Sequence, residues 1–278
     1  MTPHSIVERI WWAAHAASWF PSWTLFQIAA VIAGALFVLR EGGHRLVVPY
    51  VVGVLLAMVG AVGLGGGGEW ARWLSGGLVG PMPELEIAGF GALGGLVIGH
   101  VVVARARGVT VGRALDVLAP SIGVMIAVAR CGCFFAGCDF GAPAEGLPWA
   151  LRYPVMTPAF RVQVDAHLLA SDATMTLPVH PTQLYEVVVG LCVVAAVFAL
   201  RKPRRAGDRF ALAITVYAIG RFVVDTMRGD LAHGGAFGMT ITQGLALVVV
   251  GIVVAGLNMR GLIPSTVTCS RRASPRGR

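Results

Sequence analysis

Apolar residues gather in seven stretches along the chain, each close to the length that a helix needs to cross a lipid bilayer. The stretches lie at about 22–39, 47–64, 86–104, 112–130, 183–200, 210–226 and 239–257. A helix spans the hydrocarbon core with roughly 17–25 predominantly apolar residues. The pattern therefore predicts an all-α polytopic membrane protein with about seven transmembrane helices.

The composition excludes a soluble globular protein. Hydrophobic residues make up 56% of the chain and charged residues only 13%, and the mean hydropathy is +0.75. A soluble domain carries about 25% charged residues.

The basic residues indicate the orientation of the helices, because they concentrate in alternate loops. Fifteen of the 22 basic residues fall in four segments: Arg40 and Arg45; Arg105, Arg107 and Arg113; Arg201, Lys202, Arg204, Arg205 and Arg209; Arg260, Arg271, Arg272, Arg276 and Arg278. Cytoplasmic loops carry such an excess. We therefore expect the N-terminus outside and the C-terminus inside. The net charge of +8 then reflects topology, and no nucleic-acid partner is expected.

Three regions follow from this topology. Residues 1–21 form an interfacial segment, in which Trp11, Trp12, Trp19 and Phe20, with Trp23, are typical of an aromatic belt. Residues 22–257 form the transmembrane domain, and residues 258–278 form a basic cytoplasmic tail. The domain includes an outer loop at about 139–182, and a connection of that length is more often functional than idle.

The sixth apolar stretch carries ionisable residues, which are expensive in a membrane at about 2.5–3.5 kcal/mol each and therefore indicate function. Tyr217, Arg221, Asp225 and Arg228 are spaced i, i+4, i+8 and i+11, which predicts one helical face. Arg221 and Asp225 can pair across one turn. The alternative is a structural ion pair accompanied by an Arg228 side chain that reaches the interface.

Two more polar clusters are predicted at the same outer depth. Arg130 ends the fourth stretch, and the fifth opens with His180-Pro181-Thr182-Gln183-Leu184-Tyr185-Glu186. Two arginines at one depth suit a phospholipid phosphate, because a planar guanidinium forms bidentate hydrogen bonds with phosphate oxygens. The alternative is a set of unrelated interfacial anchors.

Three cysteines follow Arg130 with the spacing Cys131-x-Cys133-x4-Cys138. This spacing does not match a common structural zinc motif, so no metal is expected. The alternative is a zinc or redox site that includes His180. A disulfide between Cys133 and Cys138 and a pair of free packed thiols both remain open. Cys192 lies in the middle of a span, where we expect a small core residue.

Several segments resemble one family in the right order over roughly residues 22–257. Arg130-Cys131-Gly132-Cys133-Phe134 through Gly137 resembles its Arg-x-Gly-Asn-Phe-x-Asn-Gly-Glu segment, and Pro148-Trp149-Ala150 resembles its Pro-Trp-Gly. The heptapeptide from His180 to Glu186 is very similar to its His-Pro-Ser/Thr-Gln-Leu-Tyr-Glu signature. The stripe from Tyr217 to Arg228 and the segment Met239–Gln243 resemble two more of its motifs. The family is the prolipoprotein diacylglyceryl transferases of bacterial inner membranes.

The resemblance implies transfer of a diacylglyceryl group from phosphatidylglycerol, a membrane lipid, to the lipobox cysteine thiol of a prolipoprotein, with no cofactor. The catalytic residues that it implies are Arg221, Asp225, Tyr217, Glu186 and His180. The residues that it implies for phospholipid binding are Arg130, Arg221, Gly132, Gly137, Gln183, Tyr185 and Arg228.

The chain also departs from the family pattern. Its third span has Leu93-Gly94-Gly95 where the family has His-Gly-Gly, and His100 lies about 10 Å further along the helix. Cys133 and Cys138 replace an Asn and a Glu, so they are candidates for an altered site. Two alternatives therefore accompany the transferase: a phospholipid-binding protein with lost or cysteine-based chemistry, and a transporter of an anionic solute.

Overall fold

The computed structural model describes residues 5–16, 23–65, 88–155, 157–170, 172–200, 203–229 and 238–262. This part of the chain is helical and contains no strand, only four isolated β-bridges. Its elements are α1 (Ile6–Ala16), α2 (Trp23–Gly42), the 3-10 helix η1 (His44–Leu46), α3 (Val47–Gly65), α5 (Ala88–Ala106), α6 (Val111–Ala136), α7 (Pro158–Asp165), α8 (Thr182–Ala199), α9 (Asp208–Asp225) and α10 (Ile241–Leu262). The all-α prediction is confirmed.

Five helical segments of the described residues are long and apolar enough to cross a membrane. They are Trp23–Gly42, His44–Ala61, Gly89–Ala106, Val111–Ala136 and Thr182–Ala199. Helix α9 falls outside this set because Asp208, Arg209, Arg221 and Asp225 lie within it. The part of α10 whose side chains the structure describes, Ile241–Gly256, is apolar but shorter. The protein is thus a multi-pass membrane protein with five candidate spans among the seven predicted stretches.

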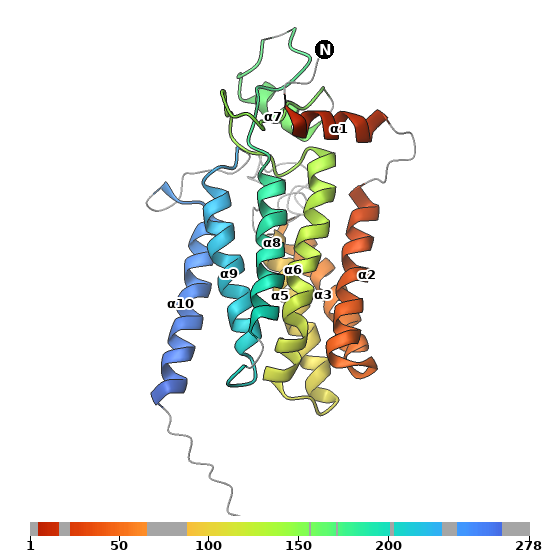
Figure 1. Cartoon of the computed structure of the whole chain (residues 1–278), viewed down its shortest axis with the longest axis vertical. Coiled ribbons are helices and arrows are strands. Elements are labelled where there is room, and N and C mark those ends of the chain that lie inside the picture. Colours follow the sequence, from red (N-terminus) through yellow and green to blue (C-terminus); the bar gives the residue numbers. More distant parts are fainter. Residues whose placement is uncertain are drawn as a thin grey trace, which may run out of the picture.

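The long helices run side by side as a bundle, with α6 in contact with α2, α8 and α9 (Figure 1). Glycines permit the closest approaches. A Cβ atom on Gly123 of α6 would lie 2.7 Å from the carbonyl oxygen of Gly190 on α8, and one on Gly99 of α5 would lie 2.8 Å from the Cα atom of Gly53 on α3. Such small-residue contacts are typical of helix pairs in membranes, where close backbone packing drives association.

We call the end of the bundle where α6 ends and α8 begins the upper end, as it is drawn in Figure 1. Helix α1 lies across this end. Its Trp11 side chain is buried and donates from Nε1 to the Phe134 carbonyl at 3.1 Å, and Ser5 donates to the Ala150 carbonyl at 2.6 Å. The described part of residues 1–21 therefore packs on the upper end, whereas Trp19 and Phe20 lie outside the described residues.

Three loop segments meet at the upper end around Gly141. The Gly141 amide donates to the His180 carbonyl at 3.0 Å, and the Ala142 amide donates to the Met227 carbonyl at 2.8 Å. A Cβ atom on Gly141 would lie 2.5 Å from the His180 carbonyl oxygen, so a larger residue would separate these segments. This junction joins the segments that follow α6, precede α8 and follow α9, and it positions the site described next.

Candidate active site at the upper end

Six charged side chains meet at the upper end, and we call them the arginine–carboxylate cluster. They come from α6, α8, α9 and the segments after α6 and α9. The members are Arg130, Asp139, Glu186, Arg221, Asp225 and Arg228. The three positive and three negative charges balance, which is what allows such groups to remain buried.

Glu186 occupies the centre of the cluster and is only 3% exposed. Its carboxylate pairs with Nε of Arg130 and Nη1 of Arg221, and Nη1 of Arg228 lies 3.8 Å away. One carboxylate therefore holds guanidinium groups from two helices and from the turn after α9. Charge-assisted hydrogen bonds of this kind are roughly twice as strong as neutral ones.

Asp139 bridges the other side of the cluster and was missed in the sequence. Its carboxylate accepts from Nη1 of Arg130 at 2.5 Å and from Nη2 of Arg228 at 2.6 Å. Its backbone has φ 54°, a left-handed conformation that Asp tolerates better than most residues. Burial alone would raise the pKa of Asp139, but Arg130, Arg228 and Arg221 together outweigh burial and hold that pKa well below its usual range.

Asp225 anchors the cluster to α10. It pairs with Nε of Arg221 at 3.0 Å and accepts from the Thr242 hydroxyl at 2.5 Å. Thr242 also lies 2.9 Å from Thr240, hydroxyl to hydroxyl. Thr242 belongs to the resembling Met239–Gln243 segment, but sequence reasoning gave it no role.

The cluster is most open where Arg130 meets Asp139. The Arg130 and Asp139 side chains are 19% and 25% exposed, whereas those of Arg221 and Arg228 are 6% and 4% exposed. An anion that reaches Arg130 can replace the carboxylate oxygens of Asp139 as acceptors, because phosphate and carboxylate oxygens present similar geometry to a guanidinium. The Arg130 guanidinium can thus exchange the Asp139 carboxylate for the phosphate of a bound ligand.

The predicted stripe on the sixth stretch is only partly helical. Tyr217, Arg221 and Asp225 lie on α9, one turn apart, but α9 ends at Asp225. Arg228 instead follows a turn in which the Met227 amide donates to the Val224 carbonyl at 2.9 Å, and its backbone bridges to Gly141. The prediction of one helical face is therefore wrong for Arg228, which reaches the cluster because the loop junction holds it there.

The predicted residues at the start of α8 have different surroundings. Gln183 is fully buried and donates to the Cys138 carbonyl at 2.6 Å and to the Tyr153 hydroxyl at 3.0 Å. Tyr185 accepts at 2.8 Å from Nε1 of Trp149, and Nδ1 of His180 lies 3.3 Å from the Tyr185 hydroxyl. Burial lowers the pKa of His180, which favours a neutral imidazole.

The two predicted glycines lie at close backbone contacts. A Cβ atom on Gly132 would lie 2.7 Å from Cβ of Phe26, so this glycine lets α2 approach α6. Gly137 ends α6 with φ 74°, where its amide donates to the Cys133 carbonyl at 2.9 Å. The left-handed conformation explains why glycine suits this helix end.

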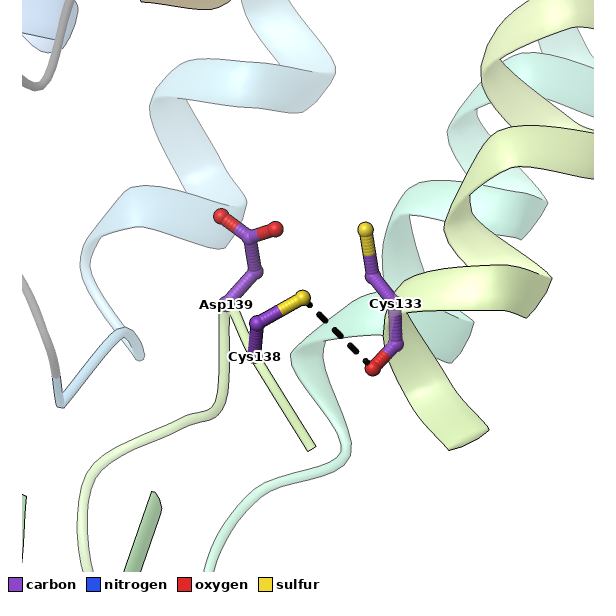
Figure 2. Close-up of side chains that lie close together, drawn as sticks. All are labelled: Cys133, Cys138 and Asp139. Carbon is purple, nitrogen blue, oxygen red and sulfur yellow. Dashed lines mark hydrogen bonds between the residues drawn. The ribbon is translucent and has the colours of Figure 1, made fainter. Parts of the chain in front are cut away.

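Cys133 and Cys138 are both free thiols in the structure and form no disulfide with each other. Nη1 of Arg130 donates to Cys133 Sγ at 3.7 Å, and Cys138 Sγ donates to the Cys133 carbonyl at 3.9 Å (Figure 2). The hydrogen bond with Cys133 and burial raise the pKa of Cys138. Cys192 is exposed on α8, so its prediction as a core residue is wrong.

The described part of the third stretch brings no histidine to the cluster. Leu93 packs against the apolar core. His100 is buried, with Nε2 3.1 Å from the Ala114 carbonyl. Ala114 precedes Arg130 by sixteen residues on the same helix, a rise of about 24 Å, so His100 lies far from the upper end.

Comparison with known proteins identifies the family. The sequence model for prolipoprotein diacylglyceryl transferase matches residues 82–257, more than half of the chain. A phosphatidylglycerol–prolipoprotein diacylglyceryl transferase of Tropheryma whipplei is 29% identical over 180 residues, 60% of each chain. Proteins with the same name from Clostridium tetani (28% identical, 61% of this chain and 63% of the relative) and Corynebacterium diphtheriae (32%, 63% and 62%) are also similar. The chain thus spans about 60% of the length of these relatives. It belongs to the prolipoprotein diacylglyceryl transferase family.

Proposed function

We propose that this protein transfers a diacylglyceryl group from phosphatidylglycerol to the lipobox cysteine thiol of a prolipoprotein, in lipoprotein biogenesis. The observation that carries the proposal is the arginine–carboxylate cluster. Three arginines converge at one end of a bundle of apolar helices, and the cluster is most open at Arg130 and Asp139. A phospholipid headgroup reaches a membrane protein at this depth, and its phosphate is the natural ligand of paired guanidinium groups.

The cluster suits the chemistry of this reaction. The acceptor thiolate attacks the glyceryl carbon that bears the phosphate oxygen, the carbon–oxygen bond breaks, and glycerol phosphate leaves with the bonding electrons. Arg130 and Arg221 stabilise the charge that develops on the leaving phosphate, as preorganised cations do in phosphoryl and acyl transfer. Glu186 and Asp139 hold these arginines in place before the lipid binds. Tyr217 lies one turn from Arg221, toward the bilayer side of the site.

We further propose seven spans, with the N-terminus outside and the C-terminus inside, in the inner membrane of a bacterium. Helices α9 and α10 would be the two additional spans. The cluster then faces the outer side, where the loop at about 139–182 would hold the prolipoprotein. Support comes from the arginines at the opposite end, where Arg113 donates to the Glu41 carbonyl at 2.8 Å, since cytoplasmic ends carry the basic excess.

Deprotonation of the acceptor thiol is the step for which the cluster offers least. Asp225, Glu186 and His180 are the candidate bases. Glu186 and Asp225 are engaged by guanidinium groups, so their carboxylate oxygens already have hydrogen-bond partners. His180 hydrogen-bonds within the loop to Tyr185.

Rescue of a bacterial strain depleted of its own diacylglyceryl transferase tests the proposal. We expect wild-type protein to restore growth and lipoprotein modification, and Arg221→Ala to restore neither at equal membrane abundance. Failure of the wild-type protein, inserted and folded, would favour a phospholipid-binding protein without this activity or an anion transporter.

A further inference from the structure

Cys133, Cys138 and Asp139 form a three-ligand cluster beside the arginines (Figure 2). Each offers one ligand atom, and the three atoms lie within 4.8 Å of one another. Cys133 is on the last turn of α6, and the other two residues directly follow Gly137, the residue that ends the helix. The left-handed backbone at Gly137 and Asp139 turns the chain back toward the helix end, which brings these side chains together.

The donor set is one that zinc prefers. Thiolate sulfur binds Zn²⁺ at about 2.3 Å and carboxylate oxygen at about 2.0–2.2 Å, so tetrahedral ligand atoms lie about 3.5–3.8 Å apart. The three ligand atoms lie within 4.8 Å of one another, so small side-chain rotations would bring them to these separations. Catalytic zinc sites have three protein ligands and one open position. From the cysteine spacing, which does not match a common structural zinc motif, no metal was expected; a three-ligand site with an open position is a different kind of site.

The surroundings of Asp139 suit a metal ligand. Its carboxylate oxygens accept hydrogen bonds from Arg130 and Arg228, and the carboxylate also hydrogen-bonds with the Cys133 thiol. A carboxylate has about four acceptor positions, so at least one remains for a metal. Hydrogen bonds from outside a metal site fix the orientation of its ligands in this way.

The charge balance of the upper end also permits the ion. The arginine–carboxylate cluster has three positive and three negative charges. A Zn²⁺ ion adds two positive charges, and two thiolate ligands would offset them. The net charge of this buried region therefore does not change, and the arginines that bind phosphate keep their counter-charges.

We propose that Cys133, Cys138 and Asp139 bind a Zn²⁺ ion whose fourth position takes the acceptor thiol of the protein substrate. This proposal rests on the proposed transferase function and specifies how the thiol is activated. The acceptor thiol replaces a zinc-bound water, and its proton passes to solvent because a zinc-bound thiol is deprotonated. The bound thiolate then attacks the glyceryl carbon, and the carbon–oxygen electron pair leaves on glycerol phosphate. Zinc stays divalent throughout.

The position of the site fits this role. Cys133 Sγ lies 3.7 Å from Nη1 of Arg130, so the activated thiol would sit next to the guanidinium that binds the lipid phosphate. The ion would supply the activation that the paired carboxylates supply poorly, in a chain with Leu93 where a family histidine is expected.

Metal binding by the purified full-length protein tests the site independently of transfer. We expect stoichiometric zinc, and after replacement by Co²⁺ an absorption spectrum with thiolate-to-cobalt charge transfer. The charge-transfer band should be lost in the double variant Cys133→Ser/Cys138→Ser and reduced in Asp139→Asn. Cys131→Ser and Cys192→Ser are matched controls that should retain the band. Thermal unfolding in detergent identifies any variant that fails to fold. If the double cysteine variant does not fold, the reduced charge-transfer band of Asp139→Asn tests the site instead.

Absence of stoichiometric metal in reduced wild-type protein, or an unchanged band in the double variant, would overturn the site. Transfer assays before and after chelation separate this inference from the proposed function. We expect chelation to reduce transfer at least tenfold and added Zn²⁺ to restore it. Full transfer by metal-free protein would overturn the zinc role and leave the transferase standing. Stoichiometric metal without any transfer would support the site and contradict the transferase.

Discussion

Glu186 and Asp116 are both buried carboxylates on long helices of the bundle, at opposite ends and with different partners. Glu186, 3% exposed, pairs with the side chains of Arg130 and Arg221. Asp116, 6% exposed, accepts from the backbone amides of Gly207, Arg209 and Phe210 at 2.8, 3.0 and 3.2 Å. One carboxylate thus holds movable guanidinium groups, and the other holds the first turn of α9.

The difference separates a binding site from a structural anchor. Amides at the start of a helix have no acceptor within the helix. Asp116 supplies that acceptor for the first turn of α9, and no other group of the helix can take its place. Guanidinium groups can rotate from a carboxylate to a phosphate without loss of hydrogen bonds. Burial of charge therefore does not by itself indicate function; the kind of partner does.

Removal of an arginine from the upper end should have the largest effect on activity. We expect Arg130→Ala and Arg221→Ala each to lower transfer at least about 100-fold, which is the loss that removal of one preorganised donor causes in other enzymes. Retention of labelled phosphatidylglycerol by the purified variants measures binding at the same time. Arg113→Ala, which removes an exposed arginine at the opposite end, is the control and should change neither. Equal losses of transfer activity in all three variants would contradict the proposal that only the arginines at the upper end bind the phospholipid.

Loss of Asp116 should reduce stability instead of chemistry. Asp116→Ala leaves three amides without their acceptor. The free energy of unfolding should fall by at least about 3 kcal/mol, because each unsatisfied group costs about 1–3 kcal/mol. Thermal unfolding in detergent measures the effect. Transfer per folded molecule should stay within about twofold of wild type; a deficit as large as that of Arg221→Ala would contradict a purely structural role.

A smaller effect is expected from Thr242, which donates to Asp225 at 2.5 Å. Thr242→Val keeps the shape of the side chain but removes the hydrogen bond that orients Asp225. A loss of about 1.4 kcal/mol in transition-state stabilisation corresponds to a tenfold lower kcat/KM. Thr215→Val, which removes a hydroxyl bonded within α9, is the matched control. If kcat/KM is the same for Thr242→Val and Thr215→Val, the orientation of Asp225 by Thr242 does not contribute to transition-state stabilisation.

The smallest effect is expected at the loop surface, where Trp149 is 46% exposed and donates to the Tyr185 hydroxyl at 2.8 Å. Trp149→Phe should raise KM for a lipobox peptide about threefold and leave kcat unchanged, because one exposed hydrogen bond contributes about 0.5–1 kcal/mol. Tyr185→Phe removes the same bond from the other partner together with the contact to Nδ1 of His180, so its KM should rise at least as much. A fall in kcat in either variant would place this pair closer to the chemistry.

The sequence predicted the helices and the depth of the charged residues because apolar length and charged positions carry that information directly. Arg130, Glu186 and Arg221 were therefore expected at one depth, and the structure adds that they touch. Asp139 was missed because its place in the cluster depends on a left-handed backbone after a helix end, which no periodicity encodes. Arg228 was assigned to a helix for a related reason: the end of α9 depends on contacts with a loop about 85 residues earlier in the sequence.

The most direct test of the arginine–carboxylate cluster as a phospholipid site is transfer by the purified protein. Phosphatidylglycerol labelled in its acyl chains is incubated with a synthetic lipobox peptide, and label in the peptide is measured for the wild type, Arg221→Ala and Asp116→Ala. We predict labelling by the wild type and by folded Asp116→Ala, and none above background by Arg221→Ala. Undiminished labelling by Arg221→Ala, or none by folded wild-type protein, would contradict the assignment.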